Sequence, residues 1–426
     1  MLDINLIREN PEKIKKGISD KNADPSLVDK FLEADKKWRE LTKKFDDLRS
    51  EQKKLGEAKK VAAPKGDEPR PEILWREQAK KIKEEIKKIE ADISDLDKIR
   101  QEILHQIPNP PLETVIVGKN EKENKVIREV GKKPEIKNPK DYFSLAQELG
   151  IIDTERAAKV SGSRFGYLKG AAVLLEFALV QLAMKTAAKD GFIPVIPPVL
   201  VGEKAMWSMG YLERGRDEIY YLPADNLYLV GTSEQSIGPM YMDEIFKEKE
   251  LPRRYIGFST CFRREAGSYG KDTKGILRVH QFDKVEMFSI VKPEDSEKEH
   301  QLILSIEEKL MRALELPYRV LDICSGDLGD PAAAKYDIEV WMPGQNGGKG
   351  EYRETHSTSN TTDFQSRRLN IKYRNKEGEI DFVHMLNGTG FSQRPILAIL
   401  ENYQTEKGTV KVPKVLQDYL GMDEIK

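Results

Sequence analysis

Residues 258–288 read FSTCFRREAGSYGKDTKGILRVHQFDKVEMF. The two ends of this stretch alternate between apolar and polar residues, and the middle carries glycines and charges. This pattern predicts two antiparallel strands, over 256–262 and 281–290, joined by a loop. Side chains two residues apart share one face of a strand, so Arg263 and Glu265 should point the same way.

One face of the second strand carries four side chains, Phe282, Lys284, Glu286 and Phe288. If the strands pair, this hairpin presents an arginine, carboxylates and an aromatic ring to one pocket. Arginine suits a phosphate because its planar fork donates paired hydrogen bonds, whereas a carboxylate suits an amine and a ring suits a purine. A half-exposed edge strand carries Arg and Glu as well, so the alternation alone leaves both interpretations open.

The N-terminal third has a different period, with apolar residues every three or four positions. The first such seam, with one polar member, is Phe31, Ala34, Trp38, Leu41, Phe45, Leu48, Gln52 and Leu55. The second seam is Trp75, Ala79, Ile82, Ile86, Ile89, Ile93 and Leu96. Two seams of this kind predict two long helices, each with one narrow apolar stripe and many exposed charges.

Residues 61–72, VAAPKGDEPRPE, cannot continue a helix because they hold three prolines and a glycine. We therefore expect an antiparallel helical hairpin over about 26–105 with its tip at about 61–72. A dimerisation coiled coil is the alternative, but pairing within the hairpin uses up the seam. The prolines at 107–113 end the second helix. The expected organisation is an N-terminal domain over 1–106, a linker over 107–139 with room for a short strand, and a globular domain over 140–426.

Bulk composition excludes several classes of protein. The 426 residues carry 71 Lys and Arg against 72 Asp and Glu, so any nucleic-acid binding must use local basic surfaces. The two cysteines, Cys261 and Cys324, cannot form an all-protein zinc site and predict reduced thiols. The N-terminus has no uninterrupted apolar core of a signal peptide. The apolar stretch 171–184 is expected to be too short and too polar to cross a bilayer, since Glu176 and Gln181 interrupt it. We expect a cytoplasmic protein.

Three segments together resemble the class II aminoacyl-tRNA synthetases. FRREAG followed by a loop and RVHQFDKVE resembles motif 2 of that class, and GFIPVIPPVL (191–200) resembles motif 1 with Pro198 as its proline. LNGTGFSQRPILAILENYQ (386–404) resembles motif 3, with Arg394 as its arginine. Within the class, GTSE (231–234), the segment 353–374 and the N-terminal hairpin are similar to the seryl family.

This resemblance implies an α+β fold, with an antiparallel catalytic sheet flanked by helices and a coiled-coil arm that binds tRNA. It implies a ligase that activates L-serine with ATP and transfers serine to tRNA(Ser), and to tRNA(Sec) where a cell has one. The implied cofactor is Mg²⁺ with ATP, and no zinc is expected. The implied partners are these tRNAs and a second copy of the chain in a homodimer, with no membrane.

The resemblance also implies roles for particular residues. Those implied to contact serine are Thr232, Ser233, Glu234, Arg263, Glu286 and Thr389. Those implied to contact ATP are Arg263, Arg264, Glu265, Phe282, Glu354, Thr355, His356, Ser357 and Arg394. Those implied to be catalytic are Arg263, Glu286 and Arg394, and those implied to hold Mg²⁺ are Glu354 and Ser357.

Two local expectations follow from the spacing of these residues. Thr232 and Glu234 are two residues apart, which agrees with a shared strand face. Glu354 and Ser357 differ in parity, so a bulge or bend near His356 is needed if both hold one ion.

Two other functions remain to be weighed. An amino acid ligase for an acceptor other than tRNA would lack the long arm and use zinc, so the intact arm and the scarce cysteines disfavour it. A non-catalytic paralogue would be expected to have lost motif residues, and Arg263, Glu286 and Arg394 are all present.

Overall fold

The computed structural model describes residues 1–61, 72–213, 215–266 and 275–426. The chain divides into two compact units. The smaller unit holds Leu2–Ser19 and Ala23–Pro108, and the larger holds Met1, Asp20–Asn22 and Asn109–Lys426. The predicted tip of the hairpin, at 61–72, falls outside the described residues except at its two ends.

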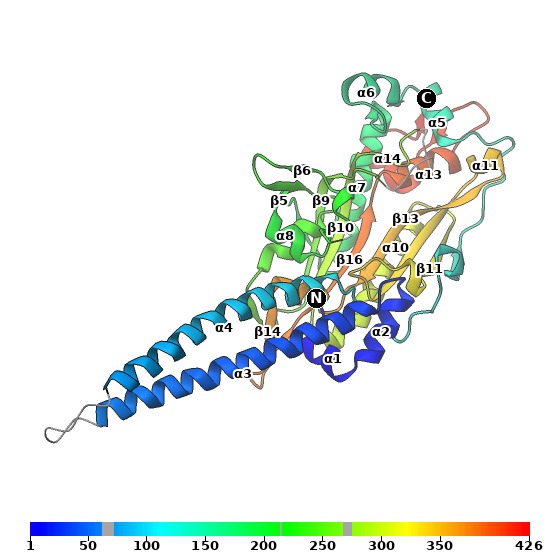
Figure 1. Cartoon of the computed structure of the whole chain (residues 1–426). Helices are drawn as coiled ribbons and strands as arrows, with labels where there is room; N and C mark the ends of the chain where they lie inside the picture. The colour runs from blue at the N-terminus through cyan, green and yellow to red at the C-terminus, as the bar shows by residue number, and fades with distance from the viewer. Residues whose placement is uncertain (62–71, 214, 267–274) are drawn as a thin grey trace, which may run out of the picture. The chain divides into compact units, whose positions relative to one another are not determined.

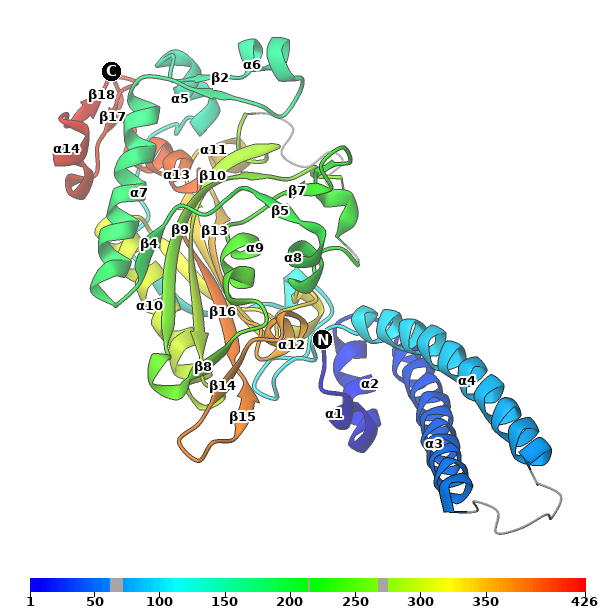
Figure 2. The same cartoon turned by 90° about the vertical axis from the view of Figure 1, so that its left-hand side faces the viewer.

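Long helices dominate the smaller unit. Two short helices, α1 (Ile4–Glu9) and α2 (Pro11–Asp20), precede α3 (Ser26–Val61) and α4 (Glu72–Gln106). Figures 1 and 2 show α3 and α4 side by side and antiparallel, which confirms the predicted helical arm. Seam residues are less exposed than their neighbours, with Phe31, Ile82 and Ile86 buried. The side chain of Trp75, the first residue of the second seam, lies outside the description.

One buried carboxylate ties the base of the arm together. The Asp35 side chain is fully buried and accepts hydrogen bonds from Arg8 Nε at 2.9 Å, Arg39 Nε at 3.0 Å and Arg100 Nη1 at 3.0 Å. Arg100 comes from the other long helix, is itself buried, and lies over the Trp38 ring at 4.1 Å. A buried ion must be paired to be tolerated, so this cluster fixes how the two helices meet.

Replacing Asp35 with Ala should destabilise the arm by about 3 kcal/mol, because Arg100 Nη1 is then buried without its acceptor and only the partly exposed Asp97 still pairs with Arg100. Urea unfolding followed by helical circular dichroism measures this change. Glu33→Ala is the matched control, since Glu33 pairs with Lys37 on the exposed face of the same helix. Glu33→Ala should leave the stability almost unchanged, because exposed ion pairs contribute little. If Asp35→Ala and Glu33→Ala changed the stability equally, the Asp35 cluster would have no special role in stabilising the arm.

An eight-stranded sheet forms the centre of the larger unit (Figures 1 and 2). Its strands, in order across the sheet, are β1 (Lys125–Val130), β11 (Tyr318–Asp322), β12 (Ala334–Met342), β13 (Glu351–Asn360), β16 (His384–Phe391), β10 (Gln281–Val291), β9 (Arg253–Phe262) and β4 (Ile193–Val195). All neighbours are antiparallel except β4 and β9. The edge strand β1 comes from the segment 107–139 that the sequence suggests is a linker.

The two faces of this sheet are covered differently. Helices α7 (Ala171–Lys189), α10 (Ser296–Ala313) and α13 (Arg394–Asn402) enclose the main core on one face. On the other face, α9 (Glu234–Ile237) and α12 (Phe364–Leu369) share a second core with the sheet. Strand β10 contributes to both cores by alternation: Val285 and Met287 enter the first, and Phe288 enters the second.

Helix α7 corrects the expectation that the apolar stretch 171–184 is too short and too polar to cross a bilayer. With 19 residues and a mean hydropathy of 1.5, it is long and apolar enough to cross a membrane. Such a helix is also common in the cores of globular proteins. Here Leu175, Leu179 and Leu182 are buried in the main core, while Leu174 and Phe177 are exposed.

Short elements complete the larger unit. The small sheets are β5 (Leu200–Gly202) with β7 (Leu227–Leu229) and β6 (Tyr221–Leu222), β15 (Ile380–Phe382) with β14 (Lys372–Arg374) and β8 (Ile245–Lys247), β2 (Ile152–Asp153) with β3 (Tyr167–Leu168), and β17 (Val410–Lys411) with β18 (Glu424–Ile425). The remaining helices are α5 (Tyr142–Glu148), α6 (Thr154–Ser161), α8 (Glu203–Ser208), α11 (Gln345–Gly348) and α14 (Lys414–Leu420).

Candidate active site

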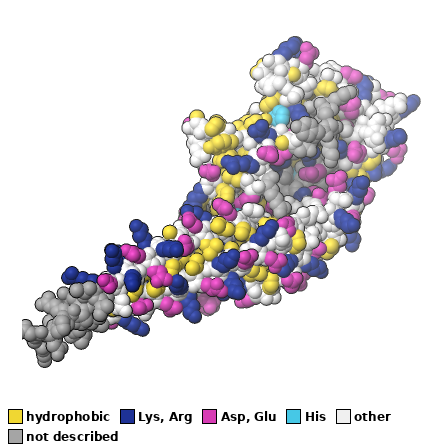
Figure 3. Space-filling view, viewed as in Figure 1, with side chains coloured by type: hydrophobic (Ala, Val, Ile, Leu, Met, Phe, Trp, Pro, Cys, Tyr) yellow, Lys and Arg dark blue, Asp and Glu magenta, His cyan; other side chains and the backbone are white. Residues whose placement is uncertain are grey.

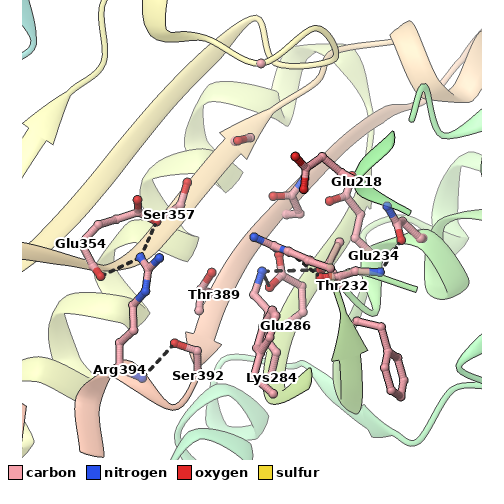
Figure 4. Close-up of a pocket in the computed structure, with 18 of the residues that line it drawn as sticks. Glu218, Thr232, Glu234, Lys284, Glu286, Glu354, Ser357, Thr389, Ser392 and Arg394 are labelled. Carbon is pink, nitrogen blue, oxygen red and sulfur yellow. Dashed lines mark hydrogen bonds and ion pairs between the residues drawn. The ribbon is translucent and has the colours of Figure 1, made fainter. Parts of the chain in front are cut away.

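A cavity of about 720 Å³ opens on the face of the sheet that carries α9. Side chains from β10, β13 and β16 form its floor, and α9 and the start of α13 contribute to its walls. Figure 4 shows the carboxylates, the arginine and the hydroxyls of these elements directed into one space. The volume suits a ligand of nucleotide size, and the lining is rich in charge.

The predicted hairpin forms the middle of the cavity. Strands β9 and β10 pair from Phe262↔Gln281 to Arg253↔Ile290. Arg263 and Glu265 follow β9 and both line the cavity, as expected. Of the four residues expected on one face of β10, three line the cavity, whereas Phe288 is buried in the core beside α9. The loop 267–274 between the strands lies outside the described residues.

Arg263 is held by its surroundings. Its Nε donates to the carbonyl of Gly231 at 3.1 Å, and its guanidinium carbon lies 5.2 Å from the centre of the Phe282 ring. Glu265 has a φ of 52°, and its carboxylate accepts from Arg278 Nη1 at 2.7 Å. Arg264 turns elsewhere, with its guanidinium 5.8 Å from the Tyr220 ring and outside the cavity lining.

Glu234 is a buried carboxylate whose two oxygens are both engaged. Tyr211 Oη donates to one oxygen at 3.0 Å, and Gln365 Nε2 donates to the other at 2.7 Å. Burial raises the pKa of Glu234, while the hydrogen bonds from Gln365 and Tyr211 oppose that rise. These two donors therefore hold the carboxylate in one orientation, at the wall of the cavity.

The expectation of a strand at 232–234 is wrong. Thr232 lies in a turn, and Glu234 begins the short helix α9. Both side chains still line the cavity, because the turn and the first helical turn place them on the same side. Ser233 lies between them and turns away: it is fully buried, and its Oγ donates to the carbonyl of Gly257 at 3.4 Å.

Glu286 and Thr389 face each other across the floor. They are register partners on β10 and β16, next to an irregularity at Val285, and both line the cavity. Glu286 is 1% exposed, and its Oε2 lies 2.5 Å from Lys284 Nζ. Burial raises the pKa of Glu286, and the charge of Lys284 opposes that effect.

The far end of the cavity is built on β13 and α13. Arg394 Nη1 donates to the carbonyl of Glu354 at 2.9 Å and lies 3.3 Å from its carboxylate (Figure 4). Glu354, Thr355 and Ser357 all line the cavity. The strand register explains how: Ile338 pairs with His356 and Glu339 with Glu354, which leaves Thr355 as an extra residue. The bulge predicted near His356 is therefore present.

His356 lies away from the cavity. Its side chain is fully buried, with Nδ1 2.9 Å from Thr355 Oγ1 and Nε2 2.9 Å from the carbonyl of Gly390. Burial lowers its pKa to about 4. A neutral buried imidazole between two strands supports the backbone, so His356 can reach an ATP ligand only through its neighbours.

Glu354 and Ser357 have the chemistry of a magnesium site. Desolvation raises the pKa of Glu354, but Arg394, Lys335 and Arg263 outweigh it and lower that pKa to about 2. The carboxylate is therefore ionised at neutral pH. Together with the hydroxyl of Ser357 it offers the oxygen ligands that Mg²⁺ prefers beside nucleotide phosphates.

Sequence patterns missed several residues of this site. Tyr211 lies between short elements where no motif marks it, and Gln365 stands inside the 353–374 segment without an assigned role. Lys335 lines the cavity and pairs with Asp337 at 3.0 Å, and Lys284 pairs with Glu286. Lys284 differs from the others, because strand alternation already placed it on the face of β10 that carries Phe282 and Glu286, although it was assigned no role.

A mainly antiparallel sheet that carries this set of arginines and carboxylates defines a class II aminoacyl-tRNA synthetase. The model of the tRNA synthetase class II core domain (G, H, P, S and T) matches residues 220–403, and that of the seryl-tRNA synthetase N-terminal domain matches residues 1–111. The serine--tRNA ligase of Acidothermus cellulolyticus is 47% identical over 100% of this chain and 99% of its own length. That of Dictyoglomus turgidum is 45% identical over the same shares. The chain belongs to the seryl-tRNA synthetase family.

Solved structures agree with this membership. Seryl-tRNA synthetase from Pyrococcus horikoshii, complexed with ATP, has a TM-score of 0.92 and 41% identity, covering 100% of this chain and 99% of that one. The cytoplasmic serine-tRNA ligase from Naegleria fowleri, in complex with AMP, has a TM-score of 0.88 and 37% identity over the same shares. Prolyl-tRNA synthetase from Giardia lamblia, at 18% identity and covering 65% of this chain, shares the fold alone.

Proposed function

We propose that this chain is a serine--tRNA ligase that activates L-serine with ATP and then esterifies it to tRNA(Ser). The observation that carries the proposal is the arrangement of charge in one cavity. Two buried carboxylates, Glu234 and Glu286, lie at one end, Arg394 and Glu354 lie at the other, and Arg263 is also in the lining. An amino acid fits the first end and a nucleotide triphosphate fits the second.

In the first step, an oxygen of the serine carboxylate attacks the α-phosphorus of ATP. The bond between the α-phosphorus and the oxygen that bridges the α- and β-phosphates breaks. Seryl-adenylate forms, and pyrophosphate leaves. A carboxylate is already a nucleophile at neutral pH, so the protein needs to position the reactants and neutralise charge. Arg263 would bridge the serine carboxylate and the α-phosphate, and Arg394 would bind the γ-phosphate.

Adenine and magnesium would occupy the rest of the cavity. Phe282 would stack on the purine ring, and Glu265, held by Arg278, would accept from its amino group. Glu354 and Ser357 would hold Mg²⁺, which supplies charge neutralisation at the phosphates when it is bound. Arg264 and His356 would support this end from the backbone, because their side chains point elsewhere, whereas Thr355 lines the cavity.

Selection of serine would rest on its hydroxyl and its ammonium group. Glu234 and Thr232 would meet the ammonium group, and Glu286 would accept from the hydroxyl, with Thr389 opposite. Alanine would leave these buried polar groups unpaired, and a site of this kind rejects such an analogue strongly. Ser233 contributes through the turn that it fixes, since its own hydroxyl bonds Gly257.

In the second step, a ribose hydroxyl at the 3′ end of tRNA attacks the acyl carbonyl, and AMP leaves. The helical arm would bind the tRNA. Figure 3 shows Lys and Arg side chains along α3 and α4, interspersed with Asp and Glu. A helical surface with charges of this kind suits recognition of shape and backbone. Because the arm would recognise tRNA by shape and backbone, the enzyme would also charge tRNA(Sec) in a cell that has it.

Cys261 and Cys324 are both free thiols, which fits the cytoplasmic location that we propose, since disulfides are rare in that compartment.

Pyrophosphate exchange into ATP, run with each of the twenty amino acids and without tRNA, tests the activation step. Serine alone should stimulate exchange, because the cavity pairs a hydroxyl and an ammonium group in a small space. Arg394→Ala should lower this exchange by at least about 100-fold, as expected for a group that neutralises phosphate charge. Stimulation by a different amino acid would refute the proposal for serine.

Replacing Tyr211 with Phe should raise the serine KM about tenfold, because Glu234 loses a hydrogen bond of the strong, charge-assisted kind. The ATP KM should change much less. Tyr221→Phe is the matched control, since its hydroxyl bonds only Asn226 in the exposed β6–β7 hairpin among the contacts described. Equal changes in both KM values would show that Tyr211 supports the fold generally.

We also propose a homodimer through α7 and β4. On these adjacent elements Leu174, Phe177 and Ile193 are 45%, 55% and 51% exposed, and Ile196, directly after β4, is 84% exposed. Exposed apolar clusters mark interfaces. Light scattering should give twice the monomer mass, and Phe177→Asp should shift it toward the monomer. Val160→Asp, at an exposed apolar position on α6, should leave the mass unchanged. A monomeric wild type would refute this part.

A further inference from the structure

Lys284 lies between the two groups that the proposed function assigns to serine. Its Nζ is 2.5 Å from Glu286 Oε2 and 3.5 Å from Thr232 Oγ1 (Figure 4). Only 12% of its side chain is exposed. Strand alternation places it there, because it shares a face of β10 with Phe282 and Glu286. A flexible surface lysine is ordinarily solvated, whereas this one is enclosed in the cavity.

The surroundings of Glu286 explain why a cation is needed. The charged or titratable groups that face it are Lys284 on its own strand, Arg263 and Cys261 from β9 and its end, Glu234 on α9, Tyr211 after α8, and Glu307 on α10. Lys284 and Arg263 are the cations in this set, and Arg263 is turned toward Gly231 and Phe282. Glu286 therefore depends on Lys284 for its close countercharge.

The neighbouring carboxyl group of Glu307 cannot supply a countercharge for Glu286. Glu307 is fully buried beneath β16, and its Oε1 would lie 2.9 Å from a Cβ placed on Gly388. Burial raises the pKa of Glu307 well above its ordinary value, with Glu286 adding to the effect. Burial and repulsion from Glu234 likewise raise the pKa of Glu286, and Lys284 is the largest opposing influence.

We propose that Lys284 is a positioning residue for the amino acid: it pins one oxygen of Glu286 as an anion and leaves the other oxygen free to accept the serine hydroxyl. This inference rests on the proposed function. It extends that function, because it makes serine recognition depend on a lysine that need not touch serine. Without Lys284, the carboxylate of Glu286 would lose the cation beside its Oε2 and would take up a proton at a higher pH than it does with Lys284 present.

The pH dependence gives the role a specific signature. Removing Lys284 leaves the influences that raise the pKa of Glu286 and deletes the main one that lowers it. The anionic form that accepts the hydroxyl is present above that pKa and is lost as pH falls through it. In a Lys284 variant, the acid side of the profile of kcat/KM for serine should therefore move to higher pH. A merely structural role would leave its midpoint unchanged.

Serine-dependent pyrophosphate exchange in Lys284→Met tests the inference. The serine KM should rise at least tenfold at pH 7, with a smaller change in the ATP KM, and the acid limb should shift upward. Lys284→Arg, which keeps the charge, should restore the position of the acid limb. If Lys284→Met does not fold, Lys284→Gln takes its place, because it also removes the charge.

A double-mutant cycle separates this role from general packing. If Lys284 acts through Glu286, the variant carrying both Lys284→Met and Glu286→Gln should have the serine KM of Glu286→Gln alone. Lys292→Met is the matched control: Lys292 directly follows the same strand and pairs with Glu294 at 2.8 Å, outside the cavity lining. Its kinetics should equal those of the wild type.

The outcomes distinguish the two proposals. Serine-stimulated exchange by the wild type, with an unchanged serine KM and acid limb in Lys284→Met, would overturn the role of Lys284 alone. Additive effects in the double variant would overturn it as well. Absence of serine-stimulated exchange in the folded, magnesium-supplied wild type would overturn the proposed function itself.

Discussion

The pairing of β9 with β10 is the constraint on which the rest of the larger unit depends. Its antiparallel register, from Phe262↔Gln281 to Arg253↔Ile290, determines which side chains enter the cavity and which enter the core. A slip by one residue would exchange Glu286 for Val285 or Met287 and place a carboxylate in the main core. β10 is an interior strand that pairs with β16 on its other side. A slip would therefore disrupt the hydrogen bonds to both neighbouring strands.

Burial of carboxylates is the cost of this arrangement. Glu234, Glu286 and Glu307 are each at most 3% exposed, and taking carboxylates out of water is unfavourable unless partners compensate. Glu234 has Tyr211 and Gln365, and Glu286 has Lys284. The cavity therefore contains buried carboxylate oxygens that accept hydrogen bonds, and few groups that donate them. A ligand that brings an ammonium group and a hydroxyl would satisfy the carboxylate oxygens in the cavity, which is the basis of selection that we propose.

The arm, unlike the cavity, keeps most of its charged side chains exposed to solvent. Its helices hold a narrow apolar seam, and most of its charges stay in water, as the mixed charges in Figure 3 show. Among the arm residues whose burial is described, Asp35 and Arg100 are charges taken out of water, and Arg8, Arg39 and Arg100 converge on the Asp35 carboxylate. Heptad spacing made the helices predictable, because a helical seam needs only local periodicity. The Asp35 cluster was not predictable, since Arg100 lies on the other long helix.

The sequence by itself determined the hairpin helices, the two central strands and the motif residues Arg263, Glu286 and Arg394, because strand alternation and heptads are local properties and motifs keep their spacing. The parity of Glu354 and Ser357 also predicted a bulge or bend near His356 if both hold one ion, and the structure has the extra residue at Thr355. Only the tertiary structure decided that Thr232 and Glu234 meet through a turn and a helix, and that His356 faces the core. It also decided that Tyr211 and Gln365 support the buried carboxylate of Glu234. These contacts join segments up to 131 residues apart, and chain-distant hydrogen bonds leave no period in a sequence.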